Sequence, residues 1–270
     1  MFTAVVPVLN QHDTTADVME SWFTLAKNRV SILFIDNGSD QPLSEQPFYR
    51  RWAEHHDVRC VRNEENVGVY PTFQQGLHET GSTFIFYSHN DVEMLEWGWD
   101  AKMTTILRLL SYHGKPGVCG MFGAKGIGTP DIYKKPYHFT QMMRWDCVTV
   151  PGMDDPGGAR QLESDYERIM VLDGFSLIVS RQMVREAMDG SFDHERFPAH
   201  HMYDQDICVT SHYGGFNNYA INVDCKHHGG VTSTREDWAQ KMGSSDHSIH
   251  RQAHRVFYEK WRGKLPVGVD

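Results

Sequence analysis

The segment TFIFYSHNDVEM, residues 83–94, joins an apolar run to a group of side chains that commonly bind ligands. The run is followed by His89, Asn90, Asp91 and Glu93. A short, continuous apolar run is typical of a strand that is buried on both faces. The arrangement therefore raises a question of function, namely what these oxygen and nitrogen donors do at the end of a buried strand.

The first part of the chain alternates apolar strands with helical patterns. Pro71 suits the first turn of a helix, and the other patterns follow from the spacing of apolar residues. The predicted strands lie within residues 2–9, 30–40, 57–68 and 83–94, and the predicted helices within 13–28 and 71–80. This alternation predicts an α/β fold with a Rossmann-like, mostly parallel sheet flanked by helices. Such sheets bind ligands beyond the carboxyl ends of their strands, where Asn90 and Asp91 fall.

The rest of the chain is less regular. Residues 114–165 are rich in glycine and proline and are expected to form long, functional loops. The remaining segments predict a helix over residues 96–113, a strand and helix over 168–188, a loop and helix over 192–215, a late strand over 216–230 and a closing helix over 247–264. The sequence contains no internal repeat.

Composition limits the classes of protein that the chain can be. With 270 residues and 40% apolar content it can form one large core. Its 26 Lys and Arg against 35 Asp and Glu give a formal net charge of −9, so it has no general attraction to nucleic acid or membranes. The five cysteines form no CxxC pair, which favours a reducing compartment over a disulfide framework or zinc ribbon. Without a signal-peptide pattern or a run of about 18 apolar residues, we expect a soluble, cytoplasmic protein.

Acidic and imidazole side chains gather at the predicted element ends. Carboxylates together with imidazoles suit Mn²⁺ or Mg²⁺, and a divalent ion held by few protein groups is typically completed by the phosphates of a nucleoside diphosphate. The clusters are Asp36 with Asp40, Asp91 with Glu93, Asp204 with Asp206, and His227 with His228.

Eight segments, taken in order, resemble the GT-A-fold glycosyltransferases, and in particular the large inverting family-2-like group. The likeness covers nearly the whole chain and is loosest in residues 114–165. Its specificity comes from the order and spacing of the motifs. They are AVVPVLN (4–10), FIDNGSD (34–40), NEENVGVYPTFQQGL (63–77), YSHNDVEM (87–94), LDGFSLIVSRQMV (172–184), FDHERFPAHHMYDQDICV (192–209), KHHGGVTS (226–233) and FYEKWRGK (257–264).

The resemblance implies a role for each matching residue. It implies a single GT-A domain, with a nucleotide-sugar-binding half over residues 1–113, an acceptor-binding and catalytic half over 114–230 and a helical tail over 231–270. The implied general base is Asp204, because inverting transfer requires a carboxylate that takes the proton of the acceptor hydroxyl. The implied donor-binding residues are Pro7, Asn10, Asp36, Arg62, Asn66, Gly68, Asn90 and Asp91; the metal ligands are Asp91, Glu93, His227 and His228; and the acceptor-side residues are Asp173, Gly174 and Asp206.

Two positions depart from the family pattern. Tyr203 stands where a glutamate is usual, and His89 stands at the first acidic position of the metal-binding element. The second change predicts that Asp91 holds the metal with less help, and Glu93 is the group that would compensate. The predicted reaction is transfer of a sugar from a nucleoside-diphosphate sugar, with Mn²⁺ or Mg²⁺, to a hydroxyl acceptor.

Other functions stay open at this point. A sugar-phosphate nucleotidyltransferase usually has a glycine-rich, basic loop after the first strand, and residues 7–15 contain no Gly, Lys or Arg. A non-catalytic nucleotide-sugar-binding module remains an alternative, with Tyr203 marking a lost acid. The acceptor is a glycan, a small molecule or a modified nucleic-acid base; the last would need a basic groove, for which the candidates are Lys134, Lys135, Arg144 and Arg160. The donor sugar, its base and the oligomeric state are not readable from the sequence.

Overall fold

The N-terminal part of the chain forms the parallel sheet that the sequence predicts. The computed structural model describes residues 1–129, 143–153, 158–197, 201–229 and 248–270, so Lys134, Lys135 and the 230–233 end of the KHHGGVTS motif lie outside the described residues. Strands β1 (Phe2–Val8), β2 (Ser31–Asp36), β3 (Asp57–Arg62) and β4 (Phe84–Ser88) pair in the parallel order β4-β1-β2-β3.

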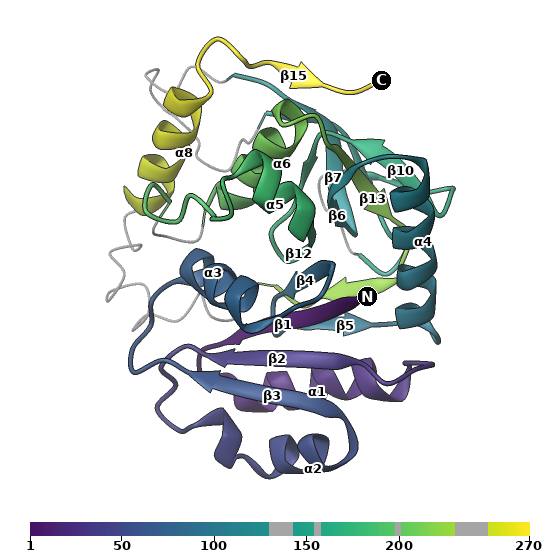
Figure 1. Cartoon of the computed structure of the whole chain (residues 1–270), viewed down its shortest axis with the longest axis vertical. Helices are drawn as coiled ribbons and strands as arrows, with labels where there is room; N and C mark the ends of the chain where they lie inside the picture. The colour runs from purple at the N-terminus through teal and green to yellow at the C-terminus, as the bar shows by residue number, and fades with distance from the viewer. Residues whose placement is uncertain (130–142, 154–157, 198–200, 230–247) are drawn as a thin grey trace.

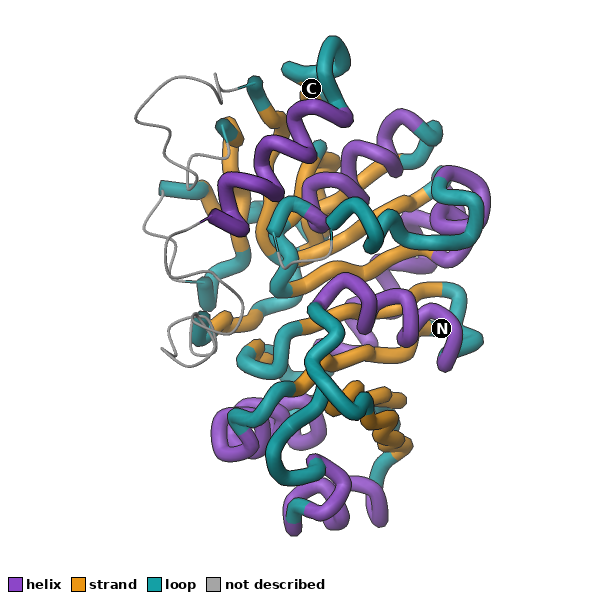
Figure 2. The backbone as a smooth tube through the Cα atoms, turned by 90° about the vertical axis from the view of Figure 1, so that its left-hand side faces the viewer, coloured by secondary structure: helices purple, strands orange, loops and turns teal. Residues whose placement is uncertain are grey.

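The central sheet continues beyond β4 into eight strands. Strand β12 (Ser176–Ser180) runs antiparallel to both β4 and β6 (Pro116–Gly120), and β13 (Asn217–Ile221) and β10 (Tyr166–Ile169) complete the order β10-β13-β6-β12-β4-β1-β2-β3. The strands β1, β4, β6 and β12 are almost entirely buried because helices cover both faces, as Figure 2 shows from the side. The predicted α/β fold with a mostly parallel sheet is confirmed.

The helices lie where right-handed crossovers place them. Helices α1 (His12–Thr24) and α2 (Pro47–His55) connect β1, β2 and β3 in one direction along the sheet, and α3 (Val69–Glu79) returns to β4 and packs on the other face (Figure 1). Helix α2 and the short 3₁₀ turn η1 (Leu43–Glu45) have no counterpart among the predicted elements. The other described helices are α4 (Trp99–His113), α5 (Arg181–Ala187), α6 (Tyr203–Tyr213) and α8 (Ser248–Lys260). In the described part of the chain, no helix is long and apolar enough to span a membrane.

The prediction of an irregular segment over residues 114–165 is wrong for its described part. Besides β6, this segment contributes three strands of a second sheet, in the order β11-β7-β8-β9 with β15 also paired to β7. The three strands are β7 (Phe122–Ile127), β8 (Arg144–Thr149) and β9 (Arg160–Gln161), and β11 (Val171–Leu172) and β15 (Val267–Gly268) complete the sheet. Several of the glycines lie inside these strands at close packing contacts, where sequence reasoning interprets them as loop residues.

Two further predictions about strands need correction, and both concern the site. Residues 83–94 do not form one strand, because β4 ends at Ser88 and Val92–Met94 forms a separate strand, β5. Residues 216–230 likewise divide into β13 and β14 (Cys225–His227). Strands β5 and β14 pair antiparallel with each other, and His227 lies opposite Val92. Hydrogen bonding between these two short strands therefore brings His227 beside Asp91.

The last helix is fastened to the domain through one buried carboxylate. Asp206, in the first turn of α6, is 0% exposed; its Oδ2 accepts a hydrogen bond from Lys260 Nζ at 2.7 Å and its Oδ1 one from Trp261 Nε1 at 2.8 Å. Lys260 also donates to Asp193 at 2.8 Å. A buried carboxylate that is paired in this way fixes the geometry between α6 and α8.

Gly120 provides a test of the close packing in the central sheet. A Cβ at this position would lie 2.3 Å from the carbonyl oxygen of Ser176 and 3.0 Å from Leu172 Cδ2. We expect Gly120→Ala to lower the free energy of unfolding by about 1–3 kcal/mol, the usual penalty of overpacking. Gly81→Ala is the matched control, since Gly81 is exposed and a Cβ there meets nothing within 4 Å. Equal stability of the two variants in urea unfolding would contradict this account.

Candidate functional site

Three side chains converge where the chain leaves β4. His227 Nε2 lies 3.2 Å from Asp91 Oδ1 and 3.4 Å from His89 Nδ1, and the last two atoms are 4.0 Å apart. We call these residues the His89–Asp91–His227 trio. They are the one group of three or more His, Cys, Asp or Glu within the described residues whose ligand atoms are close enough to hold a metal ion.

Backbone contacts hold the trio in place. The amide of His89 donates to the carbonyl of Phe175 at 2.9 Å, and the amide of His228 donates to the carbonyl of Asp91 at 3.0 Å. The ring of Phe175 stacks on the ring of His227, with centroids 4.7 Å apart and 14° between the planes. Backbone hydrogen bonds or ring packing therefore hold each of the three residues in place.

The electrostatics of the trio suit a cation. Burial raises the pKa of Asp91, but His227 and His89 outweigh it, so that the pKa lies below the usual value and the carboxylate is ionised. Burial and the neighbouring His227 lower the pKa of His89, which keeps that ring neutral and able to donate a lone pair. Asp91 is 8% exposed, and its Oδ1 accepts no aligned hydrogen bond from the described residues. A buried carboxylate oxygen without a hydrogen bond, facing two imidazole nitrogens, fits a metal site.

Glu93 and His228 lie apart from the trio, although both were predicted as metal ligands. They pair with each other, His228 Nε2 to Glu93 Oε2 at 2.8 Å, and both side chains are more than a third exposed. Sequence reasoning also missed His89 as a ligand because it treated this position as a lost acid. A signal was available, since residues 89 and 91 are two positions apart in the segment that the sequence predicts as a strand, and such positions face the same side.

Asp204 lies at the start of α6, buried and next to Gly174. Its Oδ1 accepts a hydrogen bond from the amide of Gln205 at 2.8 Å. A Cβ on Gly174 would lie 2.5 Å from the Tyr203 hydroxyl and 3.3 Å from Asp204 Oδ2, so glycine is what allows the turn to approach α6. Burial and the negative charge of Asp173 raise the pKa of Asp204 to about 6. A raised carboxylate pKa of this size is typical of a general base.

The turn of residues 173–175 joins Asp204 to the trio. Asp173 acts electrostatically on both His89 and Asp204, Gly174 packs against Asp204, and Phe175 contacts both histidines of the trio. Asp173 itself pairs with Arg144, Oδ2 to Nη1 at 3.3 Å. The structure therefore brings the predicted residues Asp91, Asp173, Gly174, Asp204 and His227 together around one turn.

Asp206 lies in a different environment from the acceptor side that the sequence implies. Its two oxygens are engaged by Lys260, the last residue of α8, and by Trp261 directly after it, and burial raises its pKa although Lys260 opposes this. Its observed contacts are structural and hold the start of α6, two residues from Asp204. Asp206 thus helps to position α6 and has no exposed oxygen in this arrangement.

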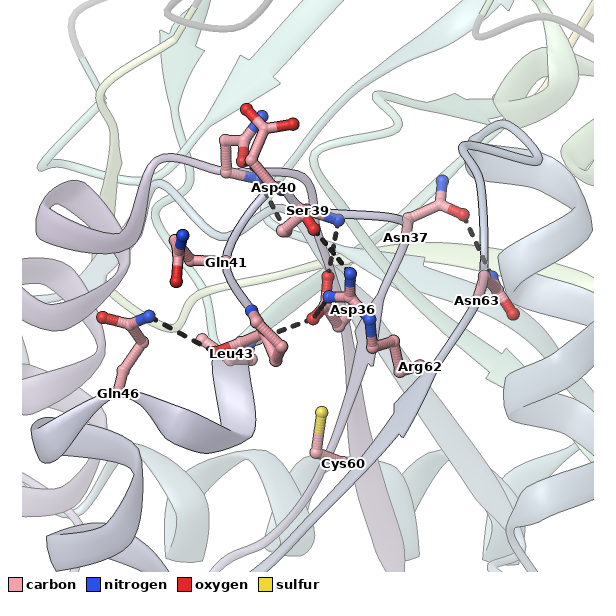
Figure 3. A network of polar contacts seen from close by, with 12 residues as sticks. Asp36, Asn37, Ser39, Asp40, Gln41, Leu43, Gln46, Cys60, Arg62 and Asn63 are labelled. Atoms are coloured by element: carbon pink, nitrogen blue, oxygen red, sulfur yellow. Dashed lines mark hydrogen bonds and ion pairs between the residues drawn. The ribbon is translucent and has the colours of Figure 1, made fainter.

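Asp36 organises the opposite side of the site, at the carboxyl end of β2 (Figure 3). It is 0% exposed and accepts hydrogen bonds from the amides of Ser39 and Leu43, both at 2.9 Å, and from Arg62 Nη1 at 2.6 Å. Burial raises the pKa of Asp36, but these donors outweigh it and the net pKa is lowered. Arg62 also donates to the Ser39 carbonyl at 2.7 Å. Asp36 therefore shapes the 37–43 loop and orients Arg62.

The remaining predicted donor residues lie along the same carboxyl edge. Asn10 accepts a hydrogen bond from the amide of Asp40 at 2.9 Å, and Asn66 accepts from Asn37 at 2.7 Å and from the amide of Gly68 at 2.9 Å. Gly68, with φ 92°, precedes the first turn of α3. Asn90 donates to Thr15 Oγ1 at 2.7 Å, and Pro7, near the end of β1, is half-buried.

Comparison with protein families identifies the group to which this chain is related. The profile of glycosyl transferase family 2 matches residues 3–186. The chain belongs to this family. This is a family of glycosyl transferases and not of the sugar-phosphate nucleotidyltransferases that the sequence left open. A search of curated proteins gives no match.

Solved structures similar to this chain include proteins determined with nucleotides or nucleotide sugars. The mannosyltransferase PcManGT from Pyrobaculum calidifontis, solved with GDP-Man and Mn²⁺, matches with a TM-score of 0.53 and 15% identity over 94% of this chain and 64% of its own. S. aureus TarS 1-349 with UDP-GlcNAc gives 0.57 and 11% over 96% and 70%. GalNAc-T7 with UDP, GalNAc and Mn²⁺ gives 0.60 and 13% over 84% and 43%.

These likenesses establish the GT-A fold. The chain spans 64% of the length of the mannosyltransferase and 43% of that of GalNAc-T7.

The hydrogen bonds to Asp36 predict a pH-dependent loss of stability in Asp36→Asn. Removing a charge that accepts three hydrogen bonds should lower the free energy of unfolding by about 1.5–3 kcal/mol at pH 7. Because the folded pKa lies below the usual 3.8, the carboxylate stabilises the fold above pH 3.8, and this stabilisation is lost as the pH falls through the folded pKa.

Urea unfolding at several pH values measures this effect. The control is Asp40→Asn, which makes the same charge change at an exposed position of the same loop. A stability difference between wild type and Asp36→Asn that does not shrink in acid, or an equal loss in Asp40→Asn, would contradict the assignment.

Proposed function

We propose that the protein transfers a sugar from a nucleoside-diphosphate sugar to a hydroxyl acceptor, with Asp204 as general base and the His89–Asp91–His227 trio as the site of a divalent cation. One observation carries the proposal: a metal-type cluster and a buried carboxylate with a raised pKa meet at one turn, residues 173–175. Membership of glycosyl transferase family 2 gives the reaction class, and this juxtaposition supports the roles of the residues.

The trio accounts for the diphosphate end of the donor. Asp91, His89 and His227 would hold Mn²⁺ or Mg²⁺ through one oxygen and two nitrogen atoms. Such an ion, when bound, neutralises the charge that develops on the departing diphosphate. The mannosyltransferase and GalNAc-T7 described above were solved with Mn²⁺ and nucleotides, which supports this choice of ligand.

The nucleoside end of the donor is assigned to the edge formed by β1, β2 and β3. Pro7, Asn10, Asp36, Arg62, Asn66, Gly68 and Asn90 are the proposed donor-side residues. Asp36 acts mainly by holding Arg62 and the 37–43 loop, because its own oxygens are already engaged. The Arg62 side chain is 38% exposed and is the charged group of this set that remains accessible to a ligand.

Asp204 is suited to take the proton of the acceptor hydroxyl. With a pKa of about 6 it is ionised at neutral pH yet basic enough to accept a proton as the acceptor oxygen attacks the anomeric carbon. The absence of a side chain on Gly174 leaves Asp204 close to the turn that carries Asp173. Attack by a hydroxyl that is deprotonated in this way is a single displacement, which inverts the anomeric carbon.

Charge pairing favours an uncharged acceptor. Arg144 pairs with Asp173, and Arg160 pairs with Asp146 at 3.1 Å and also with Glu167. Two of the basic groups considered for a nucleic-acid groove are thus neutralised by carboxylates. A polyanion gains little from such a surface, so we infer that the acceptor is a hydroxyl of a glycan or small molecule rather than of a nucleic-acid base.

Asp204→Asn tests the general base. Loss of the base should lower turnover by at least about 100-fold. The fold should be as stable as wild type or more so at pH 8, since a raised folded pKa means that ionisation of Asp204 opposes folding increasingly as the pH rises from 3.8 to about 6. Wild-type kcat/KM should rise as the pH passes about 6, where Asp204 loses its proton. Asp173→Asn should move this rise to lower pH, because the charge of Asp173 raises the pKa of Asp204. Full turnover by Asp204→Asn would exclude it as the base.

Nucleoside diphosphates test the donor site. We expect one of UDP, dTDP, GDP and ADP to stabilise the folded protein only when Mn²⁺ is present, by about 2.7 kcal/mol at 100 times its dissociation constant. Asp91→Asn should abolish this metal-dependent shift in melting temperature while the protein still folds. The diphosphate that binds identifies the donor to use in turnover assays.

Three results would argue against the proposal. Equal stabilisation with and without Mn²⁺, or by none of the four diphosphates, would contradict the donor site. Binding of a nucleotide sugar without release of the diphosphate, across a panel of hydroxyl acceptors, would support the non-catalytic module instead.

A further inference from the structure

The three donor atoms of the trio define a site of a particular size. With sides of 3.2, 3.4 and 4.0 Å, the triangle of Asp91 Oδ1, His227 Nε2 and His89 Nδ1 has a circumscribed circle of radius about 2.1 Å. This radius is the shortest distance at which one ion can contact all three atoms equally, and it is no longer than the 2.0–2.2 Å of zinc bonds to nitrogen and carboxylate oxygen. Size alone does not separate Mg²⁺ from the small transition-metal ions.

The kind of donor atom does separate them. Mg²⁺ binds oxygen ligands and water, whereas imidazole nitrogen suits transition-metal ions such as Fe²⁺, Ni²⁺ and Zn²⁺, and Mn²⁺ is the weakest binder of that series. Two of the three atoms of the trio are imidazole nitrogens, because His89 stands where the resembling proteins have an acidic residue. We propose that His89 is a metal ligand and that it makes the site selective for transition-metal ions such as Mn²⁺ over Mg²⁺. This inference rests on the proposed function of the trio.

Nearby carboxylates are engaged elsewhere and do not restore an oxygen-rich site. Glu93 pairs with His228 at 2.8 Å, and Asp173 pairs with Arg144 at 3.3 Å. Asp224, at the start of the strand that carries His227, accepts the amide of Gly152 at 2.6 Å. Asp91 is thus the carboxylate that directly faces the two rings.

The imidazoles are also held in place before any ion binds. The His89 amide donates to Phe175, the Phe175 ring stacks on His227, and strand β14 carries His227 opposite Val92. A site whose ligands are already oriented discriminates between ions by donor type, since little rearrangement is available to recruit other ligands.

Titration of the wild-type protein with metal alone tests the proposal. Free Mn²⁺ is followed by its electron paramagnetic resonance signal, and Mg²⁺ and Co²⁺ are added as competitors. We expect Co²⁺ to displace Mn²⁺ at similar or lower concentrations and Mg²⁺ to need at least about 10-fold more, in the order that nitrogen donors impose.

Three variants assign the effect to His89. His89→Ala should weaken Mn²⁺ binding by at least about 10-fold, because loss of even a group that only orients a metal ligand typically costs 10- to 100-fold in affinity. His89→Asp should narrow the gap between Mn²⁺ and Mg²⁺, because it exchanges nitrogen for a charged oxygen. His228→Ala is the matched control, a neighbouring histidine outside the trio, and should leave Mn²⁺ affinity unchanged.

The outcomes separate this inference from the proposed function. Equal binding of Mg²⁺ and Mn²⁺, or a His89→Ala variant with wild-type affinity, overturns the role of His89 and leaves the transferase assignment standing. Loss of Mn²⁺ binding in His228→Ala but not in His89→Ala would move the site to the Glu93–His228 pair. If the wild type binds none of these ions, alone or with UDP, dTDP, GDP or ADP, the metal role in the proposed function fails as well.

Discussion

The site depends on the way the chain leaves the central sheet at Ser88 and pairs again a few residues later. If β4 simply continued, Asp91 would extend along the sheet toward solvent. Instead, Val92–Met94 pairs with Cys225–His227, a strand more than a hundred residues further along the chain. This pairing buries Asp91, aligns it with His227 and leaves its Oδ1 without a hydrogen bond. Hydrogen bonding between two three-residue strands therefore sets the arrangement of Asp91 and His227 within the trio.

The turn of residues 173–175 transmits that geometry to Asp204. Phe175 contacts both histidines of the trio, and Gly174 approaches α6 so closely that any side chain would collide with Tyr203. Asp206 then holds the same helix to Lys260 and Trp261. The start of α6 is thus supported from both sides, by the turn and by α8. Such support is what a general base needs, because the distance to its proton partner decides its efficiency.

The sequence predicted the fold and some of the residues at the candidate site. The apolar strands of the N-terminal half were predictable because burial on both faces leaves an unbroken apolar run. Asp91 was predictable because it follows such a run, and Asp204 because its segment resembles a family motif. The break at Ser88 was not predictable, since Val92–Met94 is as strand-like as the run before it and only its distant partner separates the two. His89 was missed for a different reason, because its position was interpreted only as the loss of an acidic ligand. The strands of residues 116–149 were hidden because their glycines serve close contacts, as at Gly120, rather than turns.

The imidazole at position 89 also makes sense when the charges of the site are considered together. Asp173 lies near both His89 and Asp204, and its charge already raises the pKa of Asp204. A carboxylate in place of His89 would add a further negative charge beside Asp91 and Asp173, and like charges in a buried site raise each other's pKa. Asp204 would then hold its proton at higher pH and serve less well as a base near neutrality. A neutral ring would supply a metal ligand without that penalty, so the departure at position 89 suits the proposed base as well as the proposed metal site.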